Sequence, residues 1–415
     1  MKETKKYAWV VVALLWVVAL LNYMDRQMLS TMKAAMQLDI QELQSATNFG
    51  YLMAVFLWIY GLMSPLSGII ADRVNRKWLI VISLFVWSGV TYLMGYATTF
   101  NQIYWLRALM GVSEALYIPA GLSLIADFHS PKTRSLAIGI HMTGLYMGQA
   151  LGGFGATIAD KFSWQVTFHA FGLAGVVYAF FLVIFLREPK QTDLAKGEDQ
   201  LPIRIKGSLF KGLAILFTNV SFWIILFYFA VPSLPGWAAK NWLPTLFAEN
   251  LNIPMATAGP LSTITIAASS FIGVIIGGIM SDRWVQKNLR GRIYTSAIGL
   301  ALTIPSLLLL GFGHSLLHVV GAAVCFGLGF GMFDANNMPI LCQFVSARYR
   351  ATAYGLMNMT GVFFGAYITD LLGKSSDAGS LGEDFAMLAG IVVVALAVQL
   401  YFLRPKDNDF VTAQP

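Results

Sequence analysis

Four ionisable residues stand inside stretches of the chain that are otherwise almost entirely apolar. Asp25 and Arg26 follow an apolar run that begins at Trp9, and Arg107 and Glu114 lie in the apolar stretch 102–126. A charge at the centre of a bilayer costs roughly 2.5–3.5 kcal/mol on insertion scales, so charges kept there usually mark a substrate or ion pathway. The chemistry these residues offer is proton exchange on the two acids and anion binding on the two bases.

The spacing of Arg107 and Glu114 predicts that both lie on one face of a helix. Seven residues are close to two helical turns, about 10 Å of rise. Because the first and fourth apolar stretches run in opposite directions, we expect the two acid–base pairs at comparable depths, neutralising one another around a water-filled cavity. Apolar neighbours would make Glu114 easier to protonate than a Glu in water. The alternative is an ion-pair network that only fixes helix packing.

The composition indicates an integral membrane protein. Of 415 residues, 57% are hydrophobic and 12% are charged, and the mean hydropathy is +0.65. A soluble protein has about a quarter of its residues charged. The first apolar stretch is too long for the core of a signal peptide, so we expect a retained span. Cys325 and Cys342 lie in apolar runs without disulfide or metal spacing, and we expect no metal and no cofactor.

Twelve stretches reach the roughly 20 apolar residues that a helix needs to cross a bilayer. They predict an all-α membrane protein with an N-terminal half at 1–190, a cytoplasmic linker at 191–211 and a C-terminal half at 212–415. The seventh stretch holds "VPSLPGWAAKNWLP" and is expected to be broken there. The predicted spans are 8–30, 48–71, 78–97, 102–126, 135–159, 165–186, 212–247, 258–281, 293–312, 316–343, 351–373 and 384–403.

The distribution of Lys and Arg predicts the orientation. With both termini inside, inner segments hold 22 of the 28 Lys and Arg residues, outer segments hold four, and Arg26 and Arg107 fall within spans. This bias is a strong positive-inside signal. We expect a multi-pass protein of the plasma (cell inner) membrane with cytoplasmic termini. The net charge of +7 then reflects orientation and anionic lipid headgroups, not a nucleic-acid partner.

The two halves repeat each other in two loops. "GIIADRVNRK" (68–77) recurs as "GIMSDRWVQK" (278–287), and "SPKTRSLAIG" (130–139) recurs as "SARYRATAYG" (346–355). The offsets are 210 and 216 residues. Duplicated halves are typical of transporters.

The first of these loops, G-x-x-x-D-R-x-x-R-K, resembles the signature loop of the major facilitator superfamily. The resemblance covers the whole chain and implies twelve helices in two pseudo-symmetric six-helix halves, with alternating access to a pathway between them. It also implies a conformational latch in which the first glycine lets two helices approach closely. The latch residues are Gly68, Asp72, Arg73, Arg76, Asp282 and Arg283.

Further motifs look like the anion:cation symporter branch, which includes proton-coupled carriers of hexuronates, other sugar acids and sialic acid. They are "NYMDR" in the first span, F-x-W-x-Y at residues 56–60 and Arg107 seven residues before Glu114. For proton coupling, the resemblance implies that Asp25 and Glu114 carry protons and that Arg107 pairs with Glu114. For the substrate, it implies that Arg26 binds the carboxylate and that Tyr23 and Tyr60 bind hydroxyls. Asn358 would be a further polar contact.

Other polar residues in the spans are candidate substrate contacts. Asn336 and Asn337 follow Asp334 in "GMFDANNMP", and amides suit sugar hydroxyls because they both donate and accept hydrogen bonds. Lys240 would be a second cation for an acidic substrate, and His141 is a further candidate. The alternatives are hydrogen bonds between helices for the two Asn residues, a loop position for Lys240 and a packing role for His141.

These observations predict a secondary transporter, not an enzyme, that takes up a small organic anion together with protons. The expected substrate is an acidic sugar such as a uronate, aldonate or sialic acid, and the expected state is a monomer in membrane lipid. A Spinster-type carrier of lysolipids or sphingoid lipids is the alternative, because such carriers share the Asp-Arg and the Glu. Leu145 stands where sugar-acid carriers can place a Gln. A receptor or enzyme is disfavoured because HExxH, GxSxG and phosphate-loop motifs are absent from the sequence.

Overall fold

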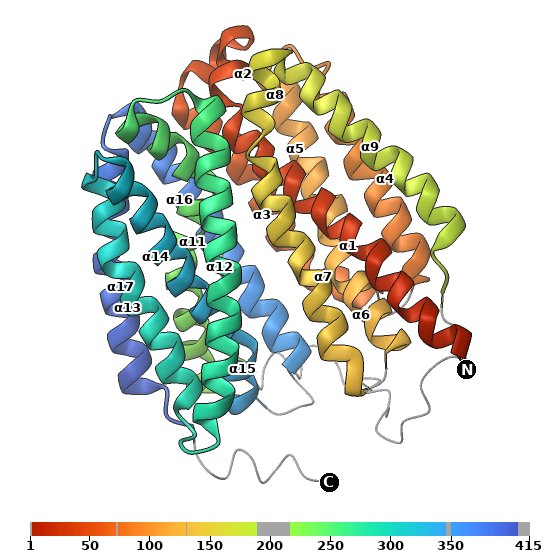
Figure 1. The fold of residues 1–415 in the computed structure, drawn as a ribbon, viewed down its shortest axis with the longest axis vertical. Helices are drawn as coiled ribbons and strands as arrows, with labels where there is room; N and C mark the ends of the chain where they lie inside the picture. Colours follow the sequence, from red (N-terminus) through yellow and green to blue (C-terminus); the bar gives the residue numbers. More distant parts are fainter. Residues whose placement is uncertain (1, 72–73, 130, 189–215, 346–349, 406–415) are drawn as a thin grey trace. The chain divides into compact units, whose positions relative to one another are not determined.

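A computed structural model describes residues 2–71, 74–129, 131–188, 216–345 and 350–405 (Figure 1). All regular secondary structure in these ranges is helical. The N-terminal helices are α1 (Lys2–Thr31), α2 (Lys33–Asp39), η1 (Gln41–Gln44), α3 (Ala46–Ala71), α4 (Arg76–Met94), α5 (Phe100–Ala115), α6 (Tyr117–Phe128), α7 (Pro131–Gly152), α8 (Gly155–Lys161) and α9 (Trp164–Phe185). The C-terminal helices are α11 (Val220–Leu251), α12 (Met255–Val285), α13 (Gly291–Phe312), α14 (Leu316–Asp334), α15 (Asn337–Phe344), α16 (Arg350–Asp377) and α17 (Leu381–Phe402).

The predicted all-α architecture of twelve spans is confirmed. Ten helical segments of the described chain are long and apolar enough to cross a membrane, and α5 with α6 and α14 with α15 each count as one of them. The more polar helices α7 and α16 complete the twelve long segments found in the described ranges. The break expected in the seventh span is wrong, because α11 continues through Pro232, Pro235 and Pro244.

The chain divides into two compact units. The first unit holds residues 1–201 and 253–264, and the second holds residues 202–252 and 265–415. The predicted linker boundaries, at 190/191 and 211/212, both fall within 189–215, outside the described residues, and stay predictions.

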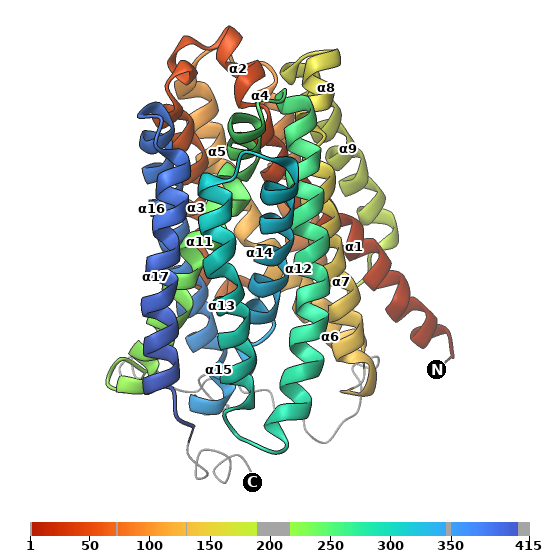
Figure 2. The ribbon, with the colours of Figure 1, turned by 60° about the vertical axis from the view of Figure 1, so that its left-hand side comes forward.

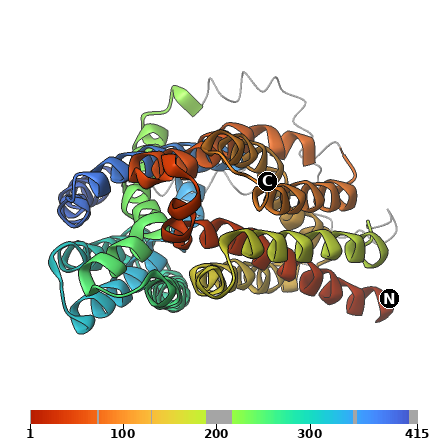
Figure 3. The ribbon, with the colours of Figure 1, turned by 90° about the horizontal axis from the view of Figure 1, so that it is seen from above.

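The two units repeat the same helix pairings. In the first unit α1 packs on α7, α4 on α9 and α4 on α5. In the second unit the corresponding pairs are α11 with α16, α13 with α17 and α13 with α14. Figure 2 shows α13 beside α17, and the view from above in Figure 3 shows α12 and α13 nearly end-on. The sequence duplication therefore extends to the packing inside each unit.

The fourth and tenth spans are each interrupted at the same place. α5 ends at Ala115 and α6 begins at Tyr117, whereas α14 ends at Asp334 and α15 begins at Asn337. Pro119 and Pro339 each stand as the third residue of the helix after the break. A proline has no N–H to donate and its ring clashes with the carbonyl four residues back, so the first turn of a helix is its most favourable position. Each break leaves a helix end near the middle of the span.

A stripe of glycines lets α7 lie directly against α1. Gly144, Gly148 and Gly152 recur every four residues and so share one face of α7. A Cβ added at Gly148 would lie 3.0 Å from the backbone nitrogen of Met24. Small residues that permit such an approach are the usual packing device of membrane helices. The stripe fixes the turn of α1 that carries Asp25 and Arg26.

We expect Gly148→Val to destabilise the first unit, because overpacking a close helix contact costs roughly 1–3 kcal/mol. The measurement is the midpoint of thermal unfolding of purified protein in detergent. Gly139→Val is the matched control on the same helix, because a Cβ at Gly139 meets no atom within 4 Å. Equal midpoints for the two variants would contradict the packing role of the stripe.

Candidate functional site

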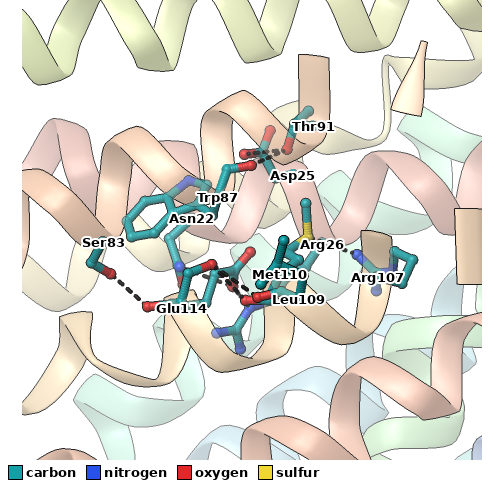
Figure 4. A network of polar contacts seen from close by, with 11 residues as sticks. Asn22, Asp25, Arg26, Ser83, Trp87, Thr91, Arg107, Leu109, Met110 and Glu114 are labelled. Carbon is teal, nitrogen blue, oxygen red and sulfur yellow. Dashed lines mark hydrogen bonds and ion pairs between the residues drawn. The ribbon is translucent and has the colours of Figure 1, made fainter. Parts of the chain in front are cut away.

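Glu114 is the centre of a buried polar cluster in the first unit (Figure 4). Its side chain is 0% exposed, and its Oε2 accepts hydrogen bonds from Arg26 Nε at 2.6 Å and from Asn22 Nδ2 at 2.9 Å. The break after Ala115 places this carboxylate at the C-terminal end of α5, where the helix dipole disfavours a negative charge. An ionised Glu114 therefore depends on the cation beside it.

Arg107 does not form the ion pair with Glu114 that the sequence predicts. Its Nη1 donates to Met110 Sδ at 3.1 Å, and its guanidinium lies 4.6 Å from the centre of the Phe56 ring. The two-turn spacing gives the two residues a common face but also about 10 Å of separation along α5, whereas α1 brings Arg26 directly to Glu114. The expected pairing is corrected accordingly, and Arg107 remains close enough to act on the charge of Glu114.

Three aromatic rings surround the guanidinium of Arg26. Its central carbon lies 5.1 Å from the ring centre of Tyr23, 4.9 Å from that of Phe56 and 4.6 Å from that of Tyr60. Its Nη2 is buried without a hydrogen-bond partner in the described part of the chain, and 11% of the side chain is exposed. A buried donor left unpaired costs about 1–3 kcal/mol. An incoming carboxylate would satisfy it.

Asp25 points away from its neighbour Arg26 and towards α4. It is 2% exposed, and its Oδ2 accepts a hydrogen bond from Thr91 Oγ1 at 3.4 Å. Successive residues of a helix point about 100° apart, so the Asp-Arg doublet does not form a local pair. The other carboxylate oxygen, Oδ1, has no hydrogen-bond partner among the described residues. Asp25 is therefore a second buried acid in an environment of its own.

The structure brings the two acids and two bases of the sequence prediction into one electrostatic cluster. Asp25 interacts with Glu114 and Arg107, and Glu114 interacts with both arginines. With all four ionised, the cluster has no net charge. The water-filled cavity expected around it stays a prediction.

The second unit holds a separate polar chain at the break in the tenth span. Tyr228 and Ser296 share a hydrogen bond of 2.8 Å, and Tyr228 donates to Asn337 Oδ1 at 3.2 Å. Asn337 in turn donates from Nδ2 to Asp334 Oδ1 at 3.1 Å. Asn337 is 3% exposed and holds Asp334 by this hydrogen bond, and its role as a substrate contact stays a prediction.

Two predicted substrate contacts are packed between helices. Asn336 is 0% exposed and donates from Nδ2 to the backbone oxygen of Met332 at 2.8 Å. His141 is also 0% exposed, with its ring 6.0 Å from that of Tyr117. Neither side chain is accessible in this structure. Asn336 makes a hydrogen bond within its own helix, whereas both ring nitrogens of His141 lack a hydrogen-bond partner among the described residues, and the role of each as a substrate contact stays a prediction. Asn358, the predicted contact in the eleventh span, is half-buried in α16.

Comparison with known families decides the class of the protein. The family model described as "Major Facilitator Superfamily" matches residues 15–369. The chain belongs to this superfamily. Its members include the relatives described below, which are transporters, so the protein is a membrane transporter and not an enzyme.

The relatives of this chain include proteins named as sugar-acid transporters and proteins named as lipid transporters. The hexuronate transporter of Bacillus subtilis (strain 168) is 24% identical over 95% of this chain and 94% of its own. The sphingosine-1-phosphate transporter SPNS2 of Xenopus tropicalis is 25% identical over 98% of this chain and 85% of its own. A crystal structure of a bacterial homolog of the human lysosomal transporter Spinster, inward-facing and unoccupied, has a TM-score of 0.82 at 19% identity, covering 97% and 98% of the two chains. That last likeness shows the fold.

The signature loop of the superfamily lies partly outside the described residues, namely at Asp72 and Arg73. At Gly68 an added Cβ would meet no atom of the described residues within 4 Å, and the close helix approach expected at this glycine stays a prediction. In the second copy Asp282 forms an ion pair of 3.5 Å with Arg292, and Arg283 is exposed. The Asp282 side chain is 72% exposed, and exposed pairs contribute about 0–1 kcal/mol.

Arg76 contacts two other segments of the first unit. Its side chain forms an ion pair with Asp127 near the end of α6. Its backbone N–H and that of Lys77 donate to the carboxylate of Glu188 at 3.4 and 2.9 Å. An acid on these first N–H groups of a helix is stabilised by the helix dipole. These contacts tie together α4, α6 and the segment after α9 inside the first unit.

Proposed function

We propose that this superfamily transporter takes up a small sugar acid together with protons. The observation that carries the proposal is the buried Arg26–Glu114 pair. Within the described residues the guanidinium of Arg26 bonds one acid, Glu114, and still has an unpaired donor. Glu114 and the substrate carboxylate would then share Arg26. The coupling ion is proposed to be the proton, with no other cofactor.

Sharing of Arg26 links the proton to the substrate. As an anion, Glu114 neutralises Arg26 and weakens its attraction for a second carboxylate. After protonation, Glu114 leaves the full positive charge of Arg26 to the substrate. Each ligand then strengthens binding of the other by the same factor, as linkage requires.

Charge balance gives a second reason for coupling between the proton and the substrate. The four ionised residues sum to zero, so a substrate anion alone would leave a net negative charge in a buried site. Burial of an uncompensated charge costs several kcal/mol. One proton per carboxylate restores neutrality, and we assign it to Glu114. Asp25 is proposed as a second carrier of this same proton, since its Oδ1 lacks a partner among the described residues.

A sugar acid suits the rings around Arg26. Tyr23 and Tyr60 bring phenol groups next to the guanidinium, and a phenol can donate to or accept from a sugar hydroxyl. The named function of the hexuronate transporter supports the same substrate class.

A lipid phosphate is the second candidate, favoured by the name of the SPNS2 relative. Sphingosine 1-phosphate carries an anion that Arg26 could bind and an apolar tail that requires an apolar path. The exposed Asp334 and the half-buried Lys240 in the second unit favour a polar substrate instead.

A panel of substrates tests the proposal. Purified protein in proteoliposomes is given glucuronate, gluconate, N-acetylneuraminate or sphingosine 1-phosphate, with and without an inward proton gradient. We expect gradient-driven accumulation of at least one of the three sugar acids and none of the lipid. Gradient-driven movement of sphingosine 1-phosphate alone would overturn the proposal in favour of the second candidate.

The proposed location is the plasma membrane, with both termini in the cytoplasm. This orientation is proposed because Lys and Arg are in excess in the predicted inner segments. A membrane-impermeant thiol reagent tests it in intact cells. We expect no labelling of a cysteine introduced at Lys2 and labelling of one introduced at Lys161, after Cys325 and Cys342 are replaced by Ser. The reverse pattern would contradict the orientation.

A further inference from the structure

A hollow of about 600 Å³ opens at the C-terminal end of α12, inside the second unit. Its lining residues on α12 are three or four positions apart, so they share one face of the helix, and the last one follows two residues after the helix end. The lining residues are Ile276, Ile279, Met280, Arg283, Trp284 and Lys287. Because the predicted span ends at residue 281, the hollow crosses the predicted boundary between hydrocarbon and water.

The two ends of this hollow differ in chemistry. Ile276 and Ile279 are exposed and lie before the predicted boundary, where exposed apolar side chains mark contact with lipid. Arg283 and Lys287 are exposed and lie beyond the boundary. Trp284 stands between the two cations, and tryptophan is enriched at the membrane–water interface. A phospholipid has the same order of groups, with apolar acyl chains next to a charged phosphate.

The cations of the hollow have no acid of their own. The side chains of Arg283 and Lys287 make no ion pair or hydrogen bond with the described part of the chain. Asp282, the one acid of segment 282–292, pairs with Arg292 at 3.5 Å. The four basic residues of this segment therefore leave it with three net positive charges.

The first copy of this repeated loop uses its lysine inside the protein. Lys77 stands where the second copy has Lys287, and its Nζ donates to the backbone oxygen of Val183 at 2.8 Å. The side chain of Lys287 is exposed instead. The second copy thus keeps a cation that the described fold does not use, and this cation is available to an anion from outside the protein.

We propose that the hollow binds one anionic phospholipid, with an acyl chain along Ile276 and Ile279 and the phosphate at Arg283 and Lys287. Water alone would satisfy isolated surface cations, whereas the apolar hollow beside them favours an amphiphilic anion. Clusters of Lys and Arg immediately cytoplasmic of a membrane helix attract anionic lipids. The site does not use the Arg26–Glu114 pair, so this inference is independent of the proposed function.

Lipid titration of the purified, delipidated protein tests the inference. Phosphatidylglycerol or phosphatidylcholine with identical acyl chains is added in detergent, and bound lipids are counted by native mass spectrometry. We expect wild type to bind one phosphatidylglycerol more tightly than phosphatidylcholine. In the double variant Arg283→Gln with Lys287→Gln, the affinity for phosphatidylglycerol should fall about tenfold or more, because both cations that attract the phosphate are lost.

A matched control removes the same charge elsewhere. Lys6→Gln with Arg404→Gln replaces two exposed cations of the predicted inner side and should bind phosphatidylglycerol like wild type. An equal loss in this control would overturn the inference, because it would show non-specific attraction.

A second variant tests the apolar end of the hollow. Ile279→Trp keeps both cations but fills the space for the acyl chain, so it should also weaken binding of phosphatidylglycerol, and it serves if the double variant does not reach the membrane. Wild-type affinity in the double variant or in Ile279→Trp would overturn the inference. Displacement of phosphatidylglycerol by an equal concentration of glycerol 3-phosphate would overturn it in favour of a site for a free phosphate ester.

Discussion

Glu114→Gln abolishes proton-driven accumulation of the substrate but leaves exchange of labelled for unlabelled substrate measurable. A glutamine cannot release a proton, so Arg26 stays available to the substrate at every pH and the driving force is lost. For one coupled proton, a gradient of one pH unit supports about tenfold accumulation, since a tenfold ratio corresponds to about 1.4 kcal/mol. We expect about tenfold for wild type and no accumulation for the variant in proteoliposomes.

The control for this experiment makes the same chemical change at an exposed site. Glu42 is exposed in the short helix η1, and the variant Glu42→Gln should accumulate substrate like wild type. Asp25→Asn should also lose gradient-driven uptake while keeping exchange, because Asp25 is proposed as the second carrier. Accumulation at the wild-type level in both Glu114→Gln and Asp25→Asn would end the proposed coupling.

Arg26→Lys lowers the catalytic efficiency of uptake, kcat/KM, about 100-fold. Lysine keeps the positive charge, so Glu114 is not left as an unpaired buried acid. It lacks the planar fork of donors that lets Arg26 bond Glu114 through Nε while another N–H group faces the substrate. The expected loss corresponds to about 2.7 kcal/mol. The measurement is initial uptake rate against substrate concentration.

Arg107→Lys is the matched control for the change at Arg26. Arg107 bonds Met110 and packs on Phe56 without a direct hydrogen bond to either acid within the described residues, so a smaller loss is expected. A larger loss for Arg107→Lys than for Arg26→Lys would show that the substrate anion is held by Arg107. The assignment of the two arginines would then have to be exchanged.

Much of the fold follows from hydropathy alone, because a lipid-facing helix must be apolar for its whole length. The continuous helix α11 shows the limit of that reasoning. Pro and Gly in "VPSLPGW" predict a break, but Pro232, Pro235 and Pro244 are accommodated inside one helix. Packing of a helix against its neighbours can offset the lost hydrogen bonds, and the sequence of one segment does not reveal that packing.

The candidate site could be predicted as a set of residues but not as a set of contacts. Buried charges are costly, so Asp25, Arg26, Arg107 and Glu114 stand out in the sequence. Which base meets which acid depends on how α1 is rotated against α5, and this is fixed by distant packing such as the Gly148 contact.

Neutral members of the cluster carry a weaker sequence signal. Asn22 donates to Glu114, and Thr91 donates to Asp25. Phe56 lies between the two arginines, 4.9 Å from Arg26 and 4.6 Å from Arg107. Each of these side chains is common in membrane helices for reasons of packing alone. The position of Asn22 one turn before Arg26, on the same helix face, is the one signal that could have indicated its role.

The proposed transport depends on Arg26 binding the substrate only when Glu114 is protonated. Calorimetric titration of purified protein with the transported sugar acid, repeated in two buffers with different ionisation enthalpies, counts the protons taken up on binding. For wild type the count should rise towards one proton per substrate as the pH is raised, and for Glu114→Gln it should be lower by about one. A wild-type count of zero at every pH where the substrate binds would contradict the account.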